Sequence, residues 1–383
     1  MDKQKILYKR YEGSDGLKSL QSAWKALVDI DNAGEFLHSY EWQLSYLEAL
    51  SEDPESVIFY CAYINEKLAA VFPLILKKTK AYGISVSTLH LPSHSHITLH
   101  DIVISSAYRA KTDVVNGLVS ALRNDTEIKW DFIVFSSVIE GSNTQIQIDH
   151  EKTALTIKIS IDNSYSINCS ETYEQTISHI PGNFRRNIAR LERKAIKQGE
   201  LGFRRIKLSD DKSNEYINQF IDIEDDSWKG DNKSSIKSSD VFINYYHALK
   251  RNFNNENPCV INFLTQNNQL IAGQFAILYK NRLNLLKIGF RSKYSNIGPG
   301  NILLSYTLND CIDNLNCTTV NIITAPKWAD KWKNNSKPVF TYYIFNKTAR
   351  GIACYYFYKC LPFIKKTLTN IKKYIQPQRK EPK

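Results

Sequence analysis

The sequence predicts an α/β (α+β) fold made of two tandem units, each a mixed, largely antiparallel sheet flanked by helices. Three observations lead to this prediction. The chain of 383 residues is longer than one typical core requires. Its hydrophobic content of 43%, with 22 Tyr and 17 Phe, is that of a globular protein. Finally, helix-like and strand-like patterns follow one another in the same order in both halves.

The first half opens with two helical patterns, near Leu17–Ile30 and Tyr40–Leu50. Strand-like runs follow, of which the first two are joined by a short polar turn and form an antiparallel pair. The expected elements are, in order, the strands Val57–Ile64, Leu68–Leu76 and Ser85–Leu91, the loop Pro92–His100, a helix near Ala107–Arg123 and the strand Asp131–Ser137.

The second half repeats this order. Helical periodicity comes first, then an antiparallel meander, then a loop, a helix and a last strand. The expected elements are helices near Pro181–Gln198, Asp211–Asp226 and Asp240–Asn252, the strands Cys259–Thr265, Leu270–Tyr279 and Arg282–Phe290, the loop Arg291–Gly300, a helix near Asn301–Leu315 and the strand Thr319–Ile323.

Charge is distributed unevenly along the chain, whose net charge is +11. Residues 1–180 hold 16 Lys and Arg against 23 Asp and Glu, residues 181–346 hold 24 against 15, and residues 347–383 hold 10 against 1. The patterns and the charge together predict a first unit over 1–165, a second over 166–346 and a basic amphipathic tail over 347–383.

The basic character begins at a predicted helix that starts at Pro181 and ends at Gly199. One face is apolar, formed by Phe184, Ile188, Leu191 and Ala195. The other surface carries Arg185, Arg186, Arg190, Arg193, Lys194 and Lys197. This surface either meets an anionic partner or is an ordinary solvated face. Arg185 and Arg186, in the first turn, are the pair that we expect to face a cleft and bind phosphate.

Six short segments, spread over roughly residues 30–345, carry a resemblance to a known family and follow one another in the same order as in that family. They are Phe36–Trp42, Leu68–Leu74, Asn183–Asn187, Glu224–Gly230, Ile297–Gly300 and Ala325–Trp328. Together they resemble the GNAT-superfamily acyltransferases of the bacterial CelD-like or BioF-like acetyltransferase family, which is related to the FemAB-type transferases. The resemblance implies two GNAT-like units, of which the second is the acyltransferase half.

The resemblance also implies a donor and its binding loop. The donor is acyl-CoA, with acetyl-CoA expected first, and no metal is required. The loop Tyr294–Gly300 and the helix after it supply backbone N–H groups for the pyrophosphate, through Ile297, Gly298, Gly300 and Asn301. Here the sequence departs from the family signature, because Ser295 takes the Gln or Arg position and Pro299 removes one donor. The alternative is that Gly and Pro only mark the start of a helix.

The implied reaction is transfer of the acyl group to an amine, and the resemblance suggests an amino sugar or related precursor of a bacterial envelope polysaccharide. A carboxylate can accept the amine proton, and Glu224 and Asp226 are the catalytic candidates. Trp228, Lys327 and Trp328 are expected to bind the acceptor, since an aromatic face suits a sugar ring. Acids that cap a helix end, and tryptophans that pack in the core, are the alternatives.

Several other classes of site are not expected. His94, His96, His100 and Asp101 form a dense cluster, which we interpret as a polar loop lining the cleft between the halves and not as a metal site. The seven cysteines are scattered and show no CxxC pair, as is typical of reduced thiols. No secretory signal or long apolar span is visible. A cytoplasmic protein is therefore expected.

Three questions stay open at this stage. The tail is rich in aromatics and Lys, which suits contact with the anionic inner face of the membrane, whereas packing of Tyr355–Tyr358 on the protein body is the alternative. A FemAB-like peptidyltransferase using aminoacyl-tRNA is the enzyme alternative, and nucleic acid is expected as a partner only in that case. The last open question is whether the chain is instead a non-catalytic scaffold in polysaccharide synthesis.

Overall fold

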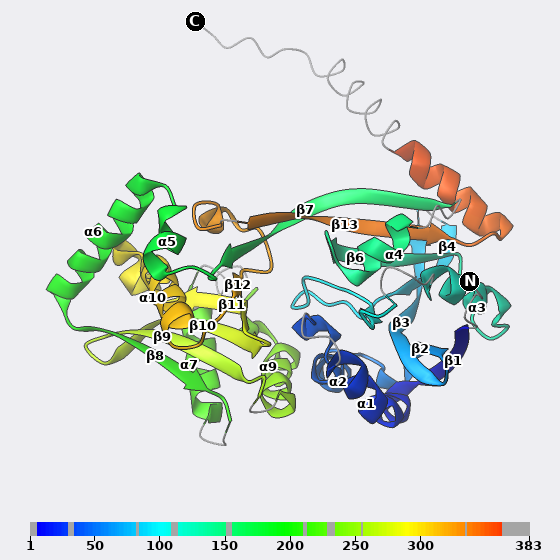
Figure 1. Ribbon diagram of the computed structural model, residues 1–383, viewed down its shortest axis with the longest axis horizontal. Helices are drawn as coiled ribbons and strands as arrows, with labels where there is room; N and C mark the ends of the chain where they lie inside the picture. Colours follow the sequence, from blue (N-terminus) through cyan, green and yellow to red (C-terminus); the bar gives the residue numbers. More distant parts are fainter. Residues whose placement is uncertain are drawn as a thin grey trace, which may run out of the picture.

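The computed structural model describes residues 6–29, 34–81, 84–108, 114–150, 155–209, 213–227, 234–253, 256–333 and 335–361 (Figure 1). The strands are β1 (Ile6–Glu12), β2 (Val57–Ile64), β3 (Lys67–Ala81), β4 (Ile84–His90), β5 (Val103–Ile104), β6 (Phe132–Ile139), β7 (Thr156–Asn168), β8 (Leu201–Lys207), β9 (Cys259–Gln266), β10 (Gln269–Tyr279), β11 (Arg282–Phe290), β12 (Thr319–Asn321) and β13 (Asn335–Phe345). The helices are α1 (Gly13–Asp29), α2 (Tyr40–Ala49), α3 (Val114–Asn124), α4 (Asn143–His150), α5 (Tyr173–Ser178), α6 (Gly182–Gln198), α7 (Ser213–Asp225), α9 (Asp240–Asn252) and α10 (Pro299–Asp313), with a further helix over 349–361.

The predicted fold class is confirmed, and the two halves share one sheet. This sheet has 13 strands in the order β1-β2-β3-β4-β6-β13-β7-β12-β11-β10-β9-β8, with β5 beside β3. In the first half β4 runs parallel to β6, and in the second β11 runs parallel to β12. The neighbouring pairs in each half are antiparallel, as the predicted meanders require.

The halves exchange strands at the middle of the sheet. β7 follows the strands of the first half in sequence, but its end pairs with β12 of the second half. β13 comes last in sequence and pairs with both β7 and β6. In Figure 1 these two long strands run along the upper side of the molecule and bridge the halves. The halves therefore cannot separate without breaking backbone hydrogen bonds.

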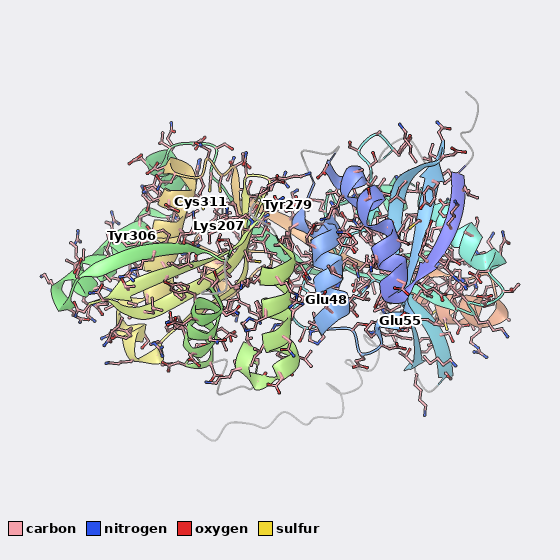
Figure 2. The ribbon with its side chains drawn as sticks, turned by 90° about the horizontal axis from the view of Figure 1, so that it is seen from below. Glu48, Glu55, Lys207, Tyr279, Tyr306 and Cys311 are labelled. Atoms are coloured by element: carbon pink, nitrogen blue, oxygen red, sulfur yellow. The ribbon has the colours of Figure 1, made fainter. Side chains whose placement is uncertain are left out.

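A shared core also joins the halves on the opposite side. α1 and α2 of the first half and α7 and α9 of the second lie along the lower side of the molecule in Figure 1. There the rings of Trp42 and Tyr245 meet edge to face, with centroids 5.9 Å apart. Figure 2 shows Glu48 on α2 beside α9, and its carboxylate pairs with Arg251 at 2.6 Å. The cleft between the halves thus has fixed walls.

The predicted basic helix is α6, and its apolar face packs as expected. Ile188 is 7% exposed and Ala195 is fully buried. The side-chain amide of Gln266 on β9 donates to the Ala195 carbonyl oxygen at 2.8 Å. Phe184 meets Trp332 edge to face at 5.6 Å. Among the described helices, none is long and apolar enough to cross a membrane.

Candidate active site

The sheet opens where β11 and β12 diverge. Their parallel pairing ends at Asn284 and Asn321, whereas β11 continues to Phe290. A cavity of about 300 Å³ occupies the gap. It is lined by Ser95, His96 and Thr98 of the first half and by Ser227, Gly273, Gln274, Leu285, Leu286, Lys287, Ile288, Gly289, Phe290, Gly300, Leu303, Ile322, Ile323, Thr324, Pro326 and Trp328 of the second. We call it the donor cavity.

Two glycines allow α7 to lie directly over the inner end of the donor cavity. Gly273 on β10 and Gly289 on β11 are register partners. A Cβ atom at Gly289 would lie 2.6 Å from the Cα atom of Glu224, and one at Gly273 would lie 2.7 Å from a ring carbon of Phe220. Since real side chains do not approach so closely, both positions require glycine for this packing.

A β-bulge shapes the wall of the donor cavity. Lys287 faces Phe275 and Leu285 faces Ala276, so Leu286 is an extra residue of β11 without a register partner on β10. Bulges redirect side chains and backbone groups and are frequent beside active sites. Here the bulge lies at the point where β11 borders the cavity.

The predicted pyrophosphate loop reaches the same cavity. Residues Ser292–Ile297 form a short 3-10 helix. Gly298 follows it with a positive φ of 62° and is the N-cap residue of α10. Gly300 lines the donor cavity. The side chain of Ile297 is fully buried in the core. Asn301 accepts a hydrogen bond from the Trp332 indole N–H at 2.8 Å, so its side chain is engaged in packing.

The cations of α6 are placed differently from the expectation. Arg185 and Arg186 are exposed in the first turn, and neither is among the residues that line the donor cavity. Lys194 donates from Nζ to the Asn296 carbonyl oxygen at 3.2 Å, within the predicted loop. The sequence gives no local signal for Lys194, because its contact with Asn296 joins segments that are 102 residues apart.

The two predicted catalytic acids differ in environment. Glu224 is fully buried, and its Oε2 accepts from the Ile236 N–H at 2.8 Å. Asp226 lies near the surface, 3.4 Å from a guanidinium nitrogen of Arg291. Neither carboxylate lines the donor cavity, although the intervening Ser227 does.

The predicted acceptor-binding residues are only partly assembled at the cavity. Trp328 is 39% exposed and lines the donor cavity. Lys327, beside it, is exposed and does not. Trp228 lies outside the described residues. The structure therefore brings Gly300 and Trp328 together and leaves Glu224, Arg185 and Arg186 away from the lining.

A histidine of the first half lines the donor cavity. His96 lines the cavity, as the interpretation of its loop as a cleft wall predicts. Its Nδ1 lies 3.3 Å from the Tyr246 hydroxyl, and its ring lies over Phe242 with centroids 4.1 Å apart. Burial, and then the charge of Glu224, raise the pKa of Tyr246 well above 10. Tyr246 therefore stays protonated next to His96.

A second cavity, of about 340 Å³, lies between the halves next to the first. We call it the seam cavity. Its lining includes polar residues of both halves, namely Glu35, His38, Asp101, Glu140, Ser142, Asn143, Ser164, Ser166, Arg282, Asn284, Thr319, Asn321, Asn335 and Lys337. Asn321 donates to Asn284 at 2.7 Å. Side chains alternate along a strand, so this pair and the Leu285–Ile322 side of the sheet point to opposite faces.

Ile323 borders both cavities. Its φ of 70° is unusual for a β-branched residue. Strained backbone of this kind is concentrated at functional sites. Ile323 thus forms part of the wall of each cavity.

The wall of the seam cavity is held by a buried carboxylate. Asp101 binds His38 Nε2 at 2.8 Å and receives the N–H groups of Asn143 and Thr144 at 3.0 and 2.7 Å. Burial alone would raise the pKa of Asp101, but these hydrogen bonds and the charge of His38 hold it below its ordinary range. His38 Nδ1 lies 3.3 Å from the Glu35 N–H, so both ring nitrogens are engaged. Within the described ranges, no group of three or more His, Cys, Asp or Glu is arranged to hold a metal ion.

The divergent parallel strands, the bulged strand and the glycine-led helix belong to a GNAT-type fold. More particularly, residues 182–334 match the family model described as Acetyltransferase (GNAT) domain. Residues 182–334 therefore carry a GNAT domain, as the resemblance predicts for the second half. No curated protein sequence matches the chain.

Solved structures share the fold of nearly the whole chain. FemX aligns with a TM-score of 0.60 at 11% identity, over 88% of this chain and 98% of that one. The C-terminal domain of a putative lysylphosphatidylglycerol synthetase from Agrobacterium fabrum aligns with a TM-score of 0.51 at 10% identity, over 87% and 94%. A conserved protein of unknown function from Bacteroides thetaiotaomicron aligns with a TM-score of 0.50 at 10% identity, over 89% of this chain and 100% of that one. At such identities the likeness concerns the fold alone.

Proposed function

We propose that the chain is an acyl-CoA-dependent N-acyltransferase that acts on an amine, with acetyl-CoA as the first candidate donor. The observation that supports this most directly is the donor cavity between β11 and β12. Its lining includes the part of β11 beyond the last pair with β12, the bulge at Leu286 and Gly300 at the start of α10.

Each part of the donor finds suitable chemistry in this arrangement. The N-terminus of α10 and the loop held by Lys194 suit the pyrophosphate. An extended pantetheine arm carries amide groups that can pair with the edge of β11 in the manner of an added strand. Backbone N–H groups near the bulge can stabilise the oxyanion that forms as the amine attacks the thioester.

The reaction would then be a direct transfer. The neutral amine attacks the carbonyl carbon, the C–S bond breaks, CoA leaves as the thiol and the amine nitrogen loses a proton. Glu224 and Asp226 remain proposals as the proton acceptor. Because Glu224 is buried, its charge would act through Tyr246 on His96, which borders the cavity itself.

The seam cavity supports an acceptor rich in hydroxyl groups. Its lining combines amide and hydroxyl side chains with two cations, Arg282 and Lys337, of which Arg282 is paired with Glu35. Trp328 at the neighbouring cavity offers an aromatic face for a sugar ring. We therefore propose an amino sugar or a related amine precursor of an envelope polysaccharide as the acceptor.

Replacing Gly300 tests the donor assignment. Gly300→Trp is expected to weaken acetyl-CoA binding at least about 100-fold, because the indole would fill the space at the start of α10. Gly300→Ala is the matched control, since its Cβ would meet Phe290 at an ordinary 3.9 Å. The measurement is calorimetric titration of each purified variant with acetyl-CoA. Equal affinity in the tryptophan variant and the wild type would contradict the loop assignment.

Lys337→Ala tests the acceptor assignment. If an anionic amino sugar occupies the seam cavity, this change is expected to raise the KM for glucosamine 6-phosphate about tenfold, with less effect on glucosamine. Acetyl-CoA affinity should not change, because Lys337 does not line the donor cavity. Lys9→Ala, an exposed lysine of β1, is the control. Parallel loss for both sugars would indicate that Lys337 does not contact the phosphate.

The two alternatives to an acyl-CoA-dependent enzyme predict different results in binding titrations with tRNA and acetyl-CoA. An aminoacyl-tRNA-dependent transferase should bind tRNA with an affinity that falls steeply with salt, through the exposed arginines of α6. A scaffold should bind neither tRNA nor acetyl-CoA. Tight, weakly salt-dependent binding of acetyl-CoA separates the proposed enzyme from both.

A further inference from the structure

The helix over 349–361 is fixed to the sheet of the first half by one of its faces. Cys354, Tyr355 and Tyr358 pack on the cluster around Phe132 and Phe345. The ring of Phe345 lies 5.6 Å from that of Tyr355 and 5.7 Å from that of Tyr358. Part of the tail therefore packs on the protein body, which is one of the two outcomes left open by the sequence.

The helix also exposes apolar side chains on its outer face. Ile352 is 37% exposed, Tyr356 is 59% exposed and Phe357 is 36% exposed. Ala353 and Cys360 are exposed too. The spacing of these five residues forms one stripe along a helix. A helix that is apolar on its packed face would normally present polar residues to water, so this stripe requires another explanation.

A strand far away in sequence extends the same surface. Ile157 of β7 packs against the cluster that holds the helix. Ile159 lies two residues further along, so its side chain is on the same face of the sheet, and it is 40% exposed. In Figure 1 β7 and the helix over 349–361 lie along the same upper side of the molecule. We define Ile159, Ile352, Tyr356 and Phe357 as the docking face.

Positive charge accompanies the docking face. Arg350 and Lys359 belong to the same helix and are exposed. Residues 347–383 contain 10 Lys and Arg against 1 acid. Apolar and aromatic side chains that lie among cations match an anionic lipid surface, where rings and aliphatic groups enter the interface and cations meet headgroups.

We propose that the docking face binds the surface of an anionic phospholipid bilayer and holds the enzyme on it without crossing it. None of the docking-face residues lines either cavity, so the inference can be tested independently of the proposed reaction.

Sedimentation with lipid vesicles tests the proposal. The full chain is mixed with vesicles of phosphatidylcholine, with or without about 30% phosphatidylglycerol. Wild type is expected to bind the anionic vesicles, and the variant with Ile352→Ser, Tyr356→Ser and Phe357→Ser at least about tenfold more weakly. Val241→Ser is the matched control, because Val241 is 43% exposed on α9, away from this face.

Each other outcome overturns the proposal. If wild type ignores anionic vesicles, no lipid surface is recognised. If the triple variant binds as well as wild type, the docking face is not the contact, and charge alone is responsible. If wild type is a dimer that the triple variant disrupts, and vesicles are not bound, the face covers a second copy of the chain. Circular dichroism of the triple variant shows that it remains folded.

Discussion

Gly289→Val is expected to lower the free energy of unfolding by about 3 kcal/mol or more and to abolish donor binding. The new Cβ would lie 2.6 Å from the Cα atom of Glu224. Backbone cannot move aside as a flexible side chain can, so α7 must shift away from the sheet. That shift would expose the apolar side chains of α7 and deform the inner end of the donor cavity. Urea denaturation and acetyl-CoA titration measure the two effects.

Gly300→Ala is the control for this experiment as well. Gly289 and Gly300 both border the donor cavity, but only Gly289 lies directly against the backbone of another element. We expect the alanine variant to be at least as stable as wild type, because alanine is favoured over glycine in a helix. If Gly289→Val unfolded at the same urea concentration as wild type, α7 would not pack on β11 as described.

Much of the fold follows from local patterns in the sequence. Alternation and short polar turns predict β2, β9, β10 and β11 close to their observed bounds, whereas β3 extends to Ala81, five residues beyond the predicted end. The prediction lacks β7 and β13, although Ile157, Ile159 and Ile161 alternate with polar residues as in a strand. Strand exchange between halves is a property of long-range pairing, which no local pattern encodes.

The candidate site was predictable only in part, because some of its contacts are local in sequence and others join remote segments. Gly298 and Gly300 give a local signal, because glycine and proline at the start of a helix have a known geometric use. The position of His96 at the donor cavity depends on how the first half meets α9 of the second. The burial of Glu224 likewise depends on Ile236 and Gly289, which come from other elements. Helical position alone could not distinguish it from an exposed acid.

Acidification from about pH 6.5 to about pH 4 is expected to destabilise the protein through its buried histidines. Burial lowers the pKa of His100 to about 4, and the side chain is 7% exposed. In the unfolded chain the pKa is about 6.5. Between these values the unfolded state binds a proton that the folded state refuses, so stability is complete above pH 6.5 and falls as the pH drops. The loss from His100 approaches about 3 kcal/mol near pH 4.

The comparison of His100→Gln with wild type isolates this effect. Urea denaturation at about pH 7 and about pH 5 should show a smaller loss of stability in the variant, by about 2 kcal/mol. Burial also lowers the pKa of His90 to about 4. The loss of stability that His90 causes on acidification is therefore present in both proteins. His179→Gln is the control, since that side chain is 54% exposed. Carboxylates such as Asp101, whose pKa is lowered, release their stabilisation only at lower pH. An equal pH slope in the His100 variant and wild type would therefore mean that the His100 ring takes up a proton within the folded protein.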